Sequence, residues 1–414
     1  MPNTSSATRS RLVWAAGLLL AALALVLLAS YLVYPPAYVY RVISWNFSDV
    51  NDYRRFPARE LETGPSGFAF RRSPDQARVA ALFEAQPEVD RLDEFLASHD
   101  TQAFLVIQDD AILYEKYLNG AARDSIVTSF SVAKSFVSAL VGIAIGEGKI
   151  AGVRDPITRY LPELAERDPR FSRITIRDLL RMSSGIRYEE FPFLWGDDAK
   201  TYYHPDLRAL ALRKTRIVGE PGAVFLYNNY HPLLLGLILE RATGVPVAEY
   251  LEERIWKPLG MEYPGSWSLD SSATGFPKME SGINARAIDF ARFGRLYLKG
   301  GAWEGREIVP AAWVAESTRM DPAPDRGSYY PTEFDLPSSA MLRYGYLWWG
   351  ICRGEDDCDF AAEGNLGQII YVSPRSGLIM VKNSASYGGL TWHQWDDLFS
   401  RVAAAFASQG HSAP

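Results

Sequence analysis

The chain has 414 residues, of which 48% are hydrophobic and 22% charged, so wholesale disorder and a collagen-like repeat are excluded. Its formal net charge of −6 argues against a general nucleic-acid binder, because neutralising phosphates requires a basic surface. The two cysteines exclude a disulfide-built scaffold and a four-cysteine metal site. The five histidines form no close pair, so neither a metal nor a cofactor is expected.

The N-terminal segment predicts a membrane-spanning helix. Residues 12–34 carry no charge, and about 20 apolar residues suffice to span a hydrocarbon layer of ~30 Å. Arg9 and Arg11 precede the run, which favours a cytoplasmic tail over residues 1–11 and places the rest of the chain outside the cytoplasm. The expected location is therefore the inner or plasma membrane, with a single span and a periplasmic domain. A cleaved signal peptide and a buried core helix are the alternatives, although a signal core is usually only about 7–15 residues long.

The segment after the anchor begins with Pro35, which ends the helix because proline lacks the N–H that would continue it. Residues 35–88 mix aromatic, arginine and proline residues, and we expect an ordered lead-in because a flexible linker would be rich in glycine and serine. Two runs of β-forming residues, 103–108 and 111–117, predict a hairpin.

A domain over residues 89–410 is expected to follow, with a helical insertion at about 150–340. Helical patterns separated by proline and glycine turns occupy residues 154–164, 175–185, 231–244 and 287–301. Strands are expected after the insertion at residues 344–350, 367–373 and 377–385, before a closing amphipathic helix at 391–407. The predicted fold class is therefore α+β, with one antiparallel sheet built from N- and C-terminal segments and flanked by helices.

A helix that begins at Ser131 is apolar on nearly every side, which is typical of a helix buried at the centre of a domain. Thr128 or Ser129 is expected to cap it. Lys134 shares a face with Ser131, and burial lowers the pKa of a lysine so that it can accept the proton of a serine nucleophile. The spacing alone is weak, because about 0.7 such pairs are expected by chance. A lysine whose stem lies along the helix start is the structural alternative.

The Tyr227-Asn228-Asn229 segment lies in a turn-rich loop before the third of these helices. A tyrosine next to a lysine can hold or relay a proton, and an asparagine amide can orient a substrate carbonyl. The same Tyr-x-Asn spacing occurs at Tyr117 and Asn119, at the end of a hairpin strand, and this copy has a purely structural interpretation.

A glycine-rich segment, residues 362–368, immediately precedes a predicted strand. Glycines at the edge of a sheet let backbone N–H groups approach a ligand closely, whereas a simple hairpin loop is the alternative interpretation.

In this order, Ser-x-x-Lys, Tyr-x-Asn and a glycine-rich strand edge resemble the serine β-lactamases and penicillin-binding enzymes. The flanking segments resemble the class C β-lactamase/DD-peptidase group, and in particular its 6-aminohexanoate-dimer hydrolase and esterase branch. These segments are SFSVAKSFVSALVGIAIGEGKI, TIRDLLRMSSGI, KPLGME and INARAIDFARFGRLYLKGG. The resemblance covers roughly residues 50–407 and implies a β-lactamase-like fold.

The resemblance implies a role for each matching residue. Ser131 corresponds to the acylated nucleophile, Lys134 to its base and Tyr227 to the second proton-handling group. Asn229 corresponds to the substrate-side amide. The oxyanion hole implied is made by the backbone N–H groups of Ser131 and Asn365.

One position departs from the family pattern. The third motif usually reads Lys-Thr-Gly or His-Thr-Gly, whereas this chain has Ala362-Glu363-Gly364. The cation that would bind a β-lactam carboxylate is missing, and Glu363 would repel such a group. Glu363 and Gly364 are therefore expected to contact a neutral or differently charged amide or ester.

The resulting hypothesis is a membrane-anchored extracytoplasmic serine hydrolase that cleaves a small amide or ester through an acyl-enzyme. A non-catalytic receptor on the same fold, or a DD-peptidase or β-lactamase proper, are the alternatives. An α/β-hydrolase is disfavoured because the chain contains no Gly-x-Ser-x-Gly. No nucleic-acid partner is expected, and the sequence does not define an oligomeric state.

The two cysteines, Cys352 and Cys358, flank a short polar loop. An exported domain meets oxidising conditions, so we expect a disulfide between them, with two incidental loop residues as the alternative.

Overall fold

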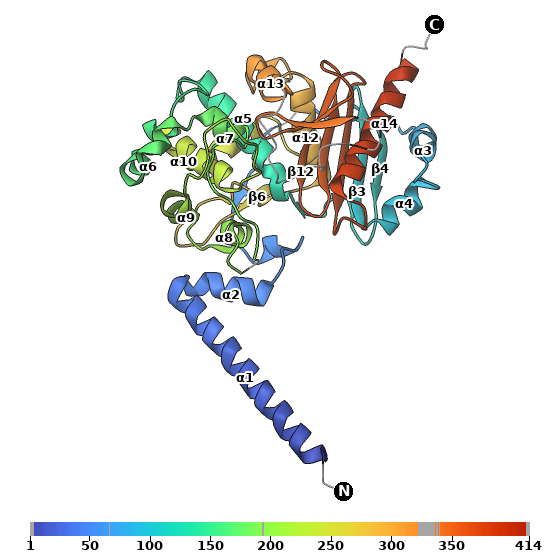
Figure 1. Ribbon diagram of the computed structural model, residues 1–414. Coiled ribbons are helices and arrows are strands. Elements are labelled where there is room, and N and C mark those ends of the chain that lie inside the picture. Colours follow the sequence, from blue (N-terminus) through green and yellow to red (C-terminus); the bar gives the residue numbers. More distant parts are fainter. Residues whose placement is uncertain are drawn as a thin grey trace.

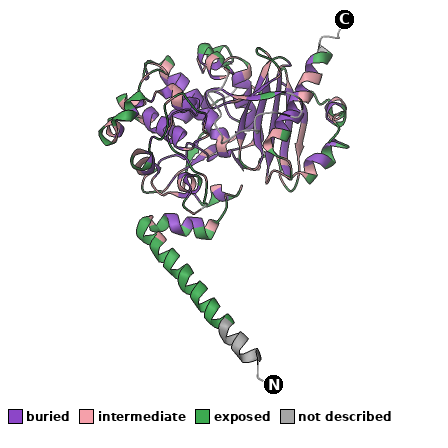
Figure 2. Cartoon of the chain, viewed as in Figure 1, coloured by how far each residue is buried: buried purple, intermediate pink, exposed green. Residues whose placement is uncertain are grey.

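The N-terminal helix projects away from the rest of the molecule (Figure 1). In the computed structural model, which describes residues 4–65, 67–192, 194–321, 336, 338 and 340–410, this helix is α1 (Thr4–Val33). Its side chains from Leu12 to Ala29 are exposed, as the green ribbon in Figure 2 shows. The stretch Leu12–Val33 is long and apolar enough to cross a bilayer.

Helix α2 (Pro36–Trp45) turns sharply from α1 and lies against the body. Its Tyr38 and Val42 belong to a small core that also contains Tyr203, from a helix of the body. Arg41 is buried there, and its guanidinium donates to the carbonyls of Tyr203 at 3.1 Å and Asp270 at 2.7 Å. The segment after α1 is therefore fixed to the body by apolar packing and by hydrogen bonds.

The main sheet combines strands from both ends of the chain, as the sequence predicted. Among the described residues it has eight strands, in the order β10 (Met341–Tyr344), β11 (Trp349–Cys352), β12 (Cys358–Gly364), β13 (Gln368–Ser373), β14 (Leu378–Ser384), β3 (Thr101–Gln108), β4 (Ala111–Tyr117) and β2 (Arg71–Arg72). Neighbouring strands are antiparallel except for β2 and β4. The predicted fold class and hairpin are confirmed.

Helices cover both faces of this sheet (Figure 1). On one face, α12 (Ala287–Leu298) approaches so closely that a Cβ on Gly294 would lie 2.9 Å from Ile370. On the other lies α14 (Trp392–Gly410), with Phe399 packed against the ring of Tyr371 at 5.8 Å. Beside it are α3 (Gln76–Glu84) and α4 (Leu92–Ser98).

The remaining helices form the helical part of the body around α5 (Ala133–Gly146), which is buried over nearly its whole length (Figure 2) and which α10, α11 and α13 contact directly. They are α6 (Pro162–Arg167), α7 (Ile176–Leu180), α8 (Asp197–Tyr203), α9 (Leu207–Lys214), α10 (Tyr230–Thr243), α11 (Val247–Leu251) and α13 (Ala311–Ser317). This part is not purely helical, which corrects the predicted helical insertion. A second sheet has the order β1 (Ala58–Leu61), β6 (Gly265–Ser268), β7 (Ile283–Ala285) and β5 (Val127–Thr128), and β8 (Ala302–Trp303) pairs with β9 (Arg306–Glu307).

The lead-in is ordered and belongs to both sheets, since β1 joins the second sheet and β2 the main one. The strand predicted over residues 344–350 is wrong. Tyr344 ends β10 and Trp349 begins β11, with Leu347 at a φ of 60° in the turn between them. This aromatic turn is buried because it packs on the helical part, where the Leu347 N–H donates to the Leu180 carbonyl at 3.1 Å.

Strand β12 contains the start of the glycine-rich segment. Residues 362–364 end this strand, residues 365–367 form the turn, and Gln368 begins β13, so the segment is both the expected strand edge and the hairpin loop of the alternative interpretation. Cys352 of β11 lies directly opposite Cys358 of β12, and the two are joined by a disulfide.

Candidate active site

Ser131 lies in a single 3₁₀ turn (Phe130–Val132) that leads directly into α5. The expected cap is absent, because the Ser129 hydroxyl donates to the Phe130 carbonyl and accepts from the Ile283 N–H at 3.0 Å. Ser129 thus ties the turn to β7. Phe130 has a φ of 43°, which costs energy for an aromatic residue and is typical of functional sites.

Lys134 is buried beneath Ser131, with 1% of its surface exposed. Its Nζ donates to the Ser131 Oγ at 2.7 Å and to the Glu280 carbonyl at 2.9 Å. Burial lowers the pKa of Lys134 to about 7, although the Glu280 and Asp198 carboxylates oppose this shift. A substantial fraction of Lys134 is therefore neutral near pH 7 and can accept a proton.

Tyr227 completes this group. The Lys134 Nζ lies 4.9 Å from the centre of the Tyr227 ring. Burial raises the pKa of Tyr227, and its hydrogen bond with Ser131 opposes the rise. Trp349 stacks on the Tyr227 ring at 5.8 Å and fixes its plane. Three side chains from two distant segments thus meet, as the sequence predicted from their combination.

The earlier Tyr-x-Asn copy does not take part. The Tyr117 hydroxyl donates to Glu115 at 2.7 Å, and the Asn119 amide donates to backbone carbonyls at 3.0 Å. Neither residue lines the cavity above Ser131. This copy therefore has the structural role that the sequence analysis gave it.

The end of β12 lies against the backbone of the Ser131 turn. A Cβ on Gly364 would lie 2.2 Å from the Ser129 carbonyl oxygen and 3.1 Å from the Ser131 nitrogen. Only glycine permits this approach. The Asn365 side chain, next along the chain, donates to the Ser48 hydroxyl at 3.0 Å and accepts from Tyr387 at 3.1 Å.

A cavity of about 590 Å³ opens above Ser131. It is lined by Phe47, Ser48, Phe130, Ser131, Glu190, Phe191, Asp198, Ala199, Tyr202, Tyr203, Tyr227, Asn229, Glu280, Ser281, Trp349, Glu363, Gly364, Asn365, Tyr387 and Trp392. Four of these described residues are carboxylic acids and none is lysine or arginine. The walls therefore combine aromatic rings with an excess of acidic groups.

Glu363 is buried in the cavity wall and forms a pair with Asp396 of α14. Burial, together with the neighbouring Asp396, raises the pKa of Glu363 well above its usual range. Burial likewise raises the pKa of Asp396 to about 8. Because two carboxylates this close cannot both ionise easily, the pair retains a proton near neutral pH. Glu363 is therefore less negative than the sequence implied, but it still supplies no cation.

Asn229 also lines the cavity, but its amide is engaged. Its Nδ2 donates to the Tyr188 hydroxyl at 2.8 Å and to the Asp198 carboxylate at 3.0 Å. Asp198 was not identified from the sequence, and neither was the buried ion pair between Lys278 and Glu280, whose charged atoms lie 2.9 Å apart. No local spacing relates these residues to Ser131, which lies far away in the chain.

The sequence matches the Beta-lactamase family over residues 90–389, most of the chain. The chain belongs to the β-lactamase family. Its resemblance to the 6-aminohexanoate-dimer hydrolase branch is confirmed by a relative of that name from Paenarthrobacter ureafaciens. The two are 29% identical over 366 residues, which cover 83% of this chain and 88% of the relative. Within the β-lactamase family, this chain is a serine hydrolase.

Two further proteins are similar to this chain. A D-aminopeptidase from Brucella anthropi is 31% identical over 134 residues, which cover 32% of this chain and 24% of that protein. Among solved structures, a Bacillus anthracis protein assigned as a 6-aminohexanoate-dimer hydrolase superposes with a TM-score of 0.70 at 23% identity. The superposition covers 87% of this chain and 92% of that one. This likeness shows that the β-lactamase-like fold is shared.

Proposed function

We propose that this β-lactamase-family protein is a membrane-anchored, extracytoplasmic amidohydrolase that acts through an acyl-enzyme on Ser131. The observation that carries the proposal is the contact between the Lys134 Nζ and the Ser131 Oγ, 2.7 Å apart at the floor of the cavity. A serine needs a base to become a nucleophile, and a lysine with a pKa of about 7 provides one at neutral pH.

In the acylation step, neutral Lys134 takes the Ser131 proton as the oxygen attacks the amide carbonyl. The tetrahedral intermediate then collapses and its C–N bond breaks, so the amine needs a proton in order to leave. Tyr227, which contacts both Ser131 and Lys134, gives its hydroxyl proton to the nitrogen and regains a proton from protonated Lys134, so the lysine is neutral again when the amine leaves. In deacylation, the same groups activate a water molecule that attacks the ester.

Stabilisation of the intermediate is assigned to backbone N–H groups of Ser131 and Asn365. The assignment is supported by the approach of Gly364 to the Ser131 nitrogen, which brings the end of β12 to the nucleophile turn. Losing one oxyanion donor typically costs about 10²–10³ in kcat, so this backbone contact is expected to be essential.

The chemistry of the walls indicates which substrates fit. The named activities of the two relatives, hydrolysis of an aminohexanoate dimer and removal of a D-amino acid, both concern amide bonds. The cavity is lined by Glu190 and Asp198, and by Glu280, which is paired with Lys278, while no described lysine or arginine lines it. Amides that are neutral or carry an ammonium group are therefore favoured over β-lactams, whose carboxylate lacks a partner.

A fluorophosphonate probe tests this proposal. Labelling of one serine in the full-length protein, lost in Ser131→Ala, is the expected result. The matched control is Ser135→Ala, which should retain the label. The Ser135 hydroxyl is buried and donates to the Leu347 carbonyl at 2.7 Å, so it does not act as the nucleophile. Labelling that persists in Ser131→Ala contradicts the mechanism, and a folded protein that takes no label supports the non-catalytic alternative. Penicillins are expected to acylate Ser131 slowly.

A further inference from the structure

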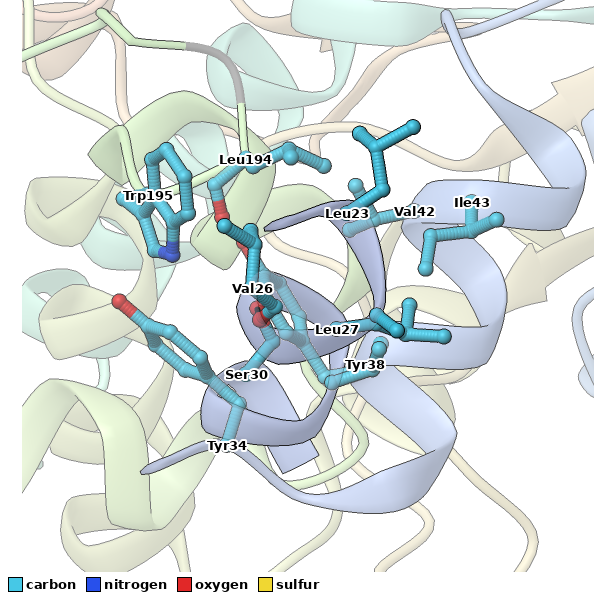
Figure 3. A pocket seen from close by; sticks show the side chains of 12 residues that line it. Leu23, Val26, Leu27, Ser30, Tyr34, Tyr38, Val42, Ile43, Leu194 and Trp195 are labelled. Carbon is cyan, nitrogen blue, oxygen red and sulfur yellow. Dashed lines mark hydrogen bonds between the residues drawn. The ribbon is translucent and has the colours of Figure 1, made fainter. Parts of the chain in front are cut away.

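A second cavity, of about 290 Å³, lies between the anchor helix and the body (Figure 3). Helix α1 forms one wall, α2 forms another, and the loop before α8 closes it with Leu194 and Trp195. We call it the anchor groove. Its lining is almost entirely apolar: Leu23, Ala24, Val26, Leu27, Ser30, Tyr34, Tyr38, Val39, Val42, Ile43, Leu194 and Trp195.

Polar groups at the anchor groove are largely occupied within the protein. The Ser30 hydroxyl donates to the Val26 carbonyl at 2.8 Å, one turn back along α1. The Tyr38 hydroxyl donates to the Leu194 carbonyl at 2.8 Å, which ties α2 to the loop. An occupant therefore finds dispersion contacts and an apolar surface, which select a hydrocarbon group rather than a polar ligand.

The position of the groove along α1 indicates what that hydrocarbon group is. The groove extends from Leu23 to Tyr34, a separation of eleven positions, which is about 16 Å at 1.5 Å per residue. This is about half of a ~30 Å hydrocarbon layer, the depth of one leaflet. If α1 spans the bilayer, its outer half supplies one wall of the groove. The groove is then surrounded by the acyl chains of outer-leaflet lipids.

The neighbouring surface carries exposed aromatic and apolar side chains. Phe47, Phe191 and Trp195 expose 67%, 77% and 41% of their surface, and Ile43 on α2 exposes 50%. Tryptophan and tyrosine are enriched where proteins meet the boundary between lipid and water, which applies to Trp195, and the other three side chains add exposed apolar surface. Phe47 and Phe191 line the cavity above Ser131, and in the chain they lie four residues after Ile43 and three residues before Leu194 of the anchor groove, so short stretches of chain connect the two cavities.

We propose that the anchor groove binds one acyl chain of an outer-leaflet lipid and thereby holds the rim of the Ser131 cavity at the membrane surface. This inference rests on the anchoring part of the proposed function and is independent of the catalytic part. The alternative occupant, α1 of a second copy, would pack helix against helix and exclude lipid from the groove.

Photocrosslinking tests the occupant directly. Full-length protein is placed in nanodiscs of phosphatidylcholine that contain a fraction of phosphatidylcholine with a diazirine in its acyl chain. Any spanning helix is labelled by such a lipid, so the informative sites are Leu194 and Trp195, which belong to the body. Labelling of these two residues after irradiation and peptide mapping is the expected result.

Two alanines of α1 provide matched variants. Ala24 lines the groove, whereas Ala22 is exposed and does not line it. Ala24→Trp fills the groove, so it should abolish the cross-links at Leu194 and Trp195. Ala22→Trp adds the same side chain at nearly the same depth and should leave them unchanged. Fluorophosphonate labelling of Ser131 should be equal in both variants, which shows that each one folds.

Four outcomes overturn the inference. The first is labelling of α1 without labelling of Leu194 and Trp195. The second and third concern the variants: cross-links at these two residues that persist in Ala24→Trp, or that are lost in both Ala24→Trp and Ala22→Trp. The fourth is disulfide capture of two α1 helices through cysteines placed at Ala24. An intact mass that lacks α1 overturns the anchoring proposal as well. The Ser131 labelling measured in the same samples decides the catalytic proposal separately.

Discussion

Lys134 is a buried amine in contact with the Ser131 hydroxyl, and it can accept the proton of that hydroxyl only when it is neutral. Removing it leaves Ser131 without a base, so Lys134→Ala is expected to lower kcat/KM by about 10²–10⁴. Thermal unfolding of the variant checks that the fold remains. A rate equal to that of the wild type would contradict the role of Lys134.

Tyr227 is expected to matter differently for two classes of substrate. An amine must be protonated to leave, whereas an activated phenol ester releases a stable phenolate without help. Tyr227→Phe should therefore lower amide hydrolysis more than hydrolysis of such an ester. The measurement is the ratio of the two kcat/KM values, and an unchanged ratio would remove Tyr227 from proton transfer.

The pH dependence follows from the same amine. Because neutral Lys134 is the active form and its pKa is about 7, kcat/KM should increase as the pH rises through 7. Asp198 raises the pKa of Lys134, so Asp198→Asn should move this midpoint to lower pH. Glu280 acts in the same direction as Asp198, Lys278 acts against them, and both remain in this variant.

Asp197, the neighbour of Asp198 on α8, provides the control. Its carboxylate accepts from Lys200 at 3.0 Å and from the Tyr230 hydroxyl at 3.1 Å, and it does not line the cavity. Asp197→Asn should leave the midpoint unchanged even if it lowers stability. An equal shift in both variants would mean that the effect is not local to Lys134.

At the scale of elements, the contact between β12 and the Ser131 turn depends on Gly364 having no Cβ. In Gly364→Ala the new Cβ would lie 2.2 Å from the Ser129 carbonyl oxygen, so strand and turn must separate. A displaced oxyanion donor is expected to cost about 10²-fold or more in kcat. Gly354→Ala in the nearby hairpin meets nothing closer than 4.0 Å and should retain wild-type activity.

The disulfide between β11 and β12 closes a loop with a sequence separation of only 6. Constraining so short a loop removes little chain entropy, so replacing Cys352 and Cys358 by serine should lower the free energy of unfolding by about 2 kcal/mol or less. Urea unfolding measures this difference. Two alkylatable thiols in periplasmically produced protein would show that the bond does not form in the cell.

The pattern of apolar residues along the chain predicted those helices and strands whose apolar faces are the ones buried in the fold. The hairpin of β3 and β4 and the helix that begins near Ser131 were predicted because alternation and all-round apolarity report directly on packing. The turn at residues 345–348 was mistaken for a strand because its aromatic side chains are buried by the helical part, a tertiary effect. The short strands of the second sheet, such as β5, carry too few residues for a period to be visible.

The candidate site was predicted only in part, and for a similar reason. Ser131, Lys134 and Tyr227 belong to motifs whose residue types and order are informative. Asp198 and Glu280 act on Lys134 through space, and no spacing in the chain records that relation. The proton shared by Glu363 and Asp396 also depends on a helix and a strand meeting in three dimensions.

At the scale of the whole molecule, the long apolar helix α1 lies at the N-terminal end. The direction in which this helix crosses a membrane can be tested. With the N-terminus inside the cell, a periplasm-dependent reporter fused after Pro414 should be active, because a single span places the C-terminus outside. The same reporter on a chain that begins at Pro35 provides the control and should be inactive. Activity of a cytoplasm-dependent reporter after Pro414 would contradict the topology.

Arg41 and Tyr38 attach α2 to the body at three carbonyls, those of Tyr203, Asp270 and Leu194. The chain therefore has no slack between its proposed anchor and the rest of the molecule. A domain on a loose tether would sample many heights above a membrane, whereas this one would keep Ser131 at a nearly constant distance from it. Because the body and α1 move together, rocking of the body would tilt α1. A bilayer of different thickness would favour a different tilt of α1, and would thereby change the height above the membrane at which Ser131 can reach a substrate bond.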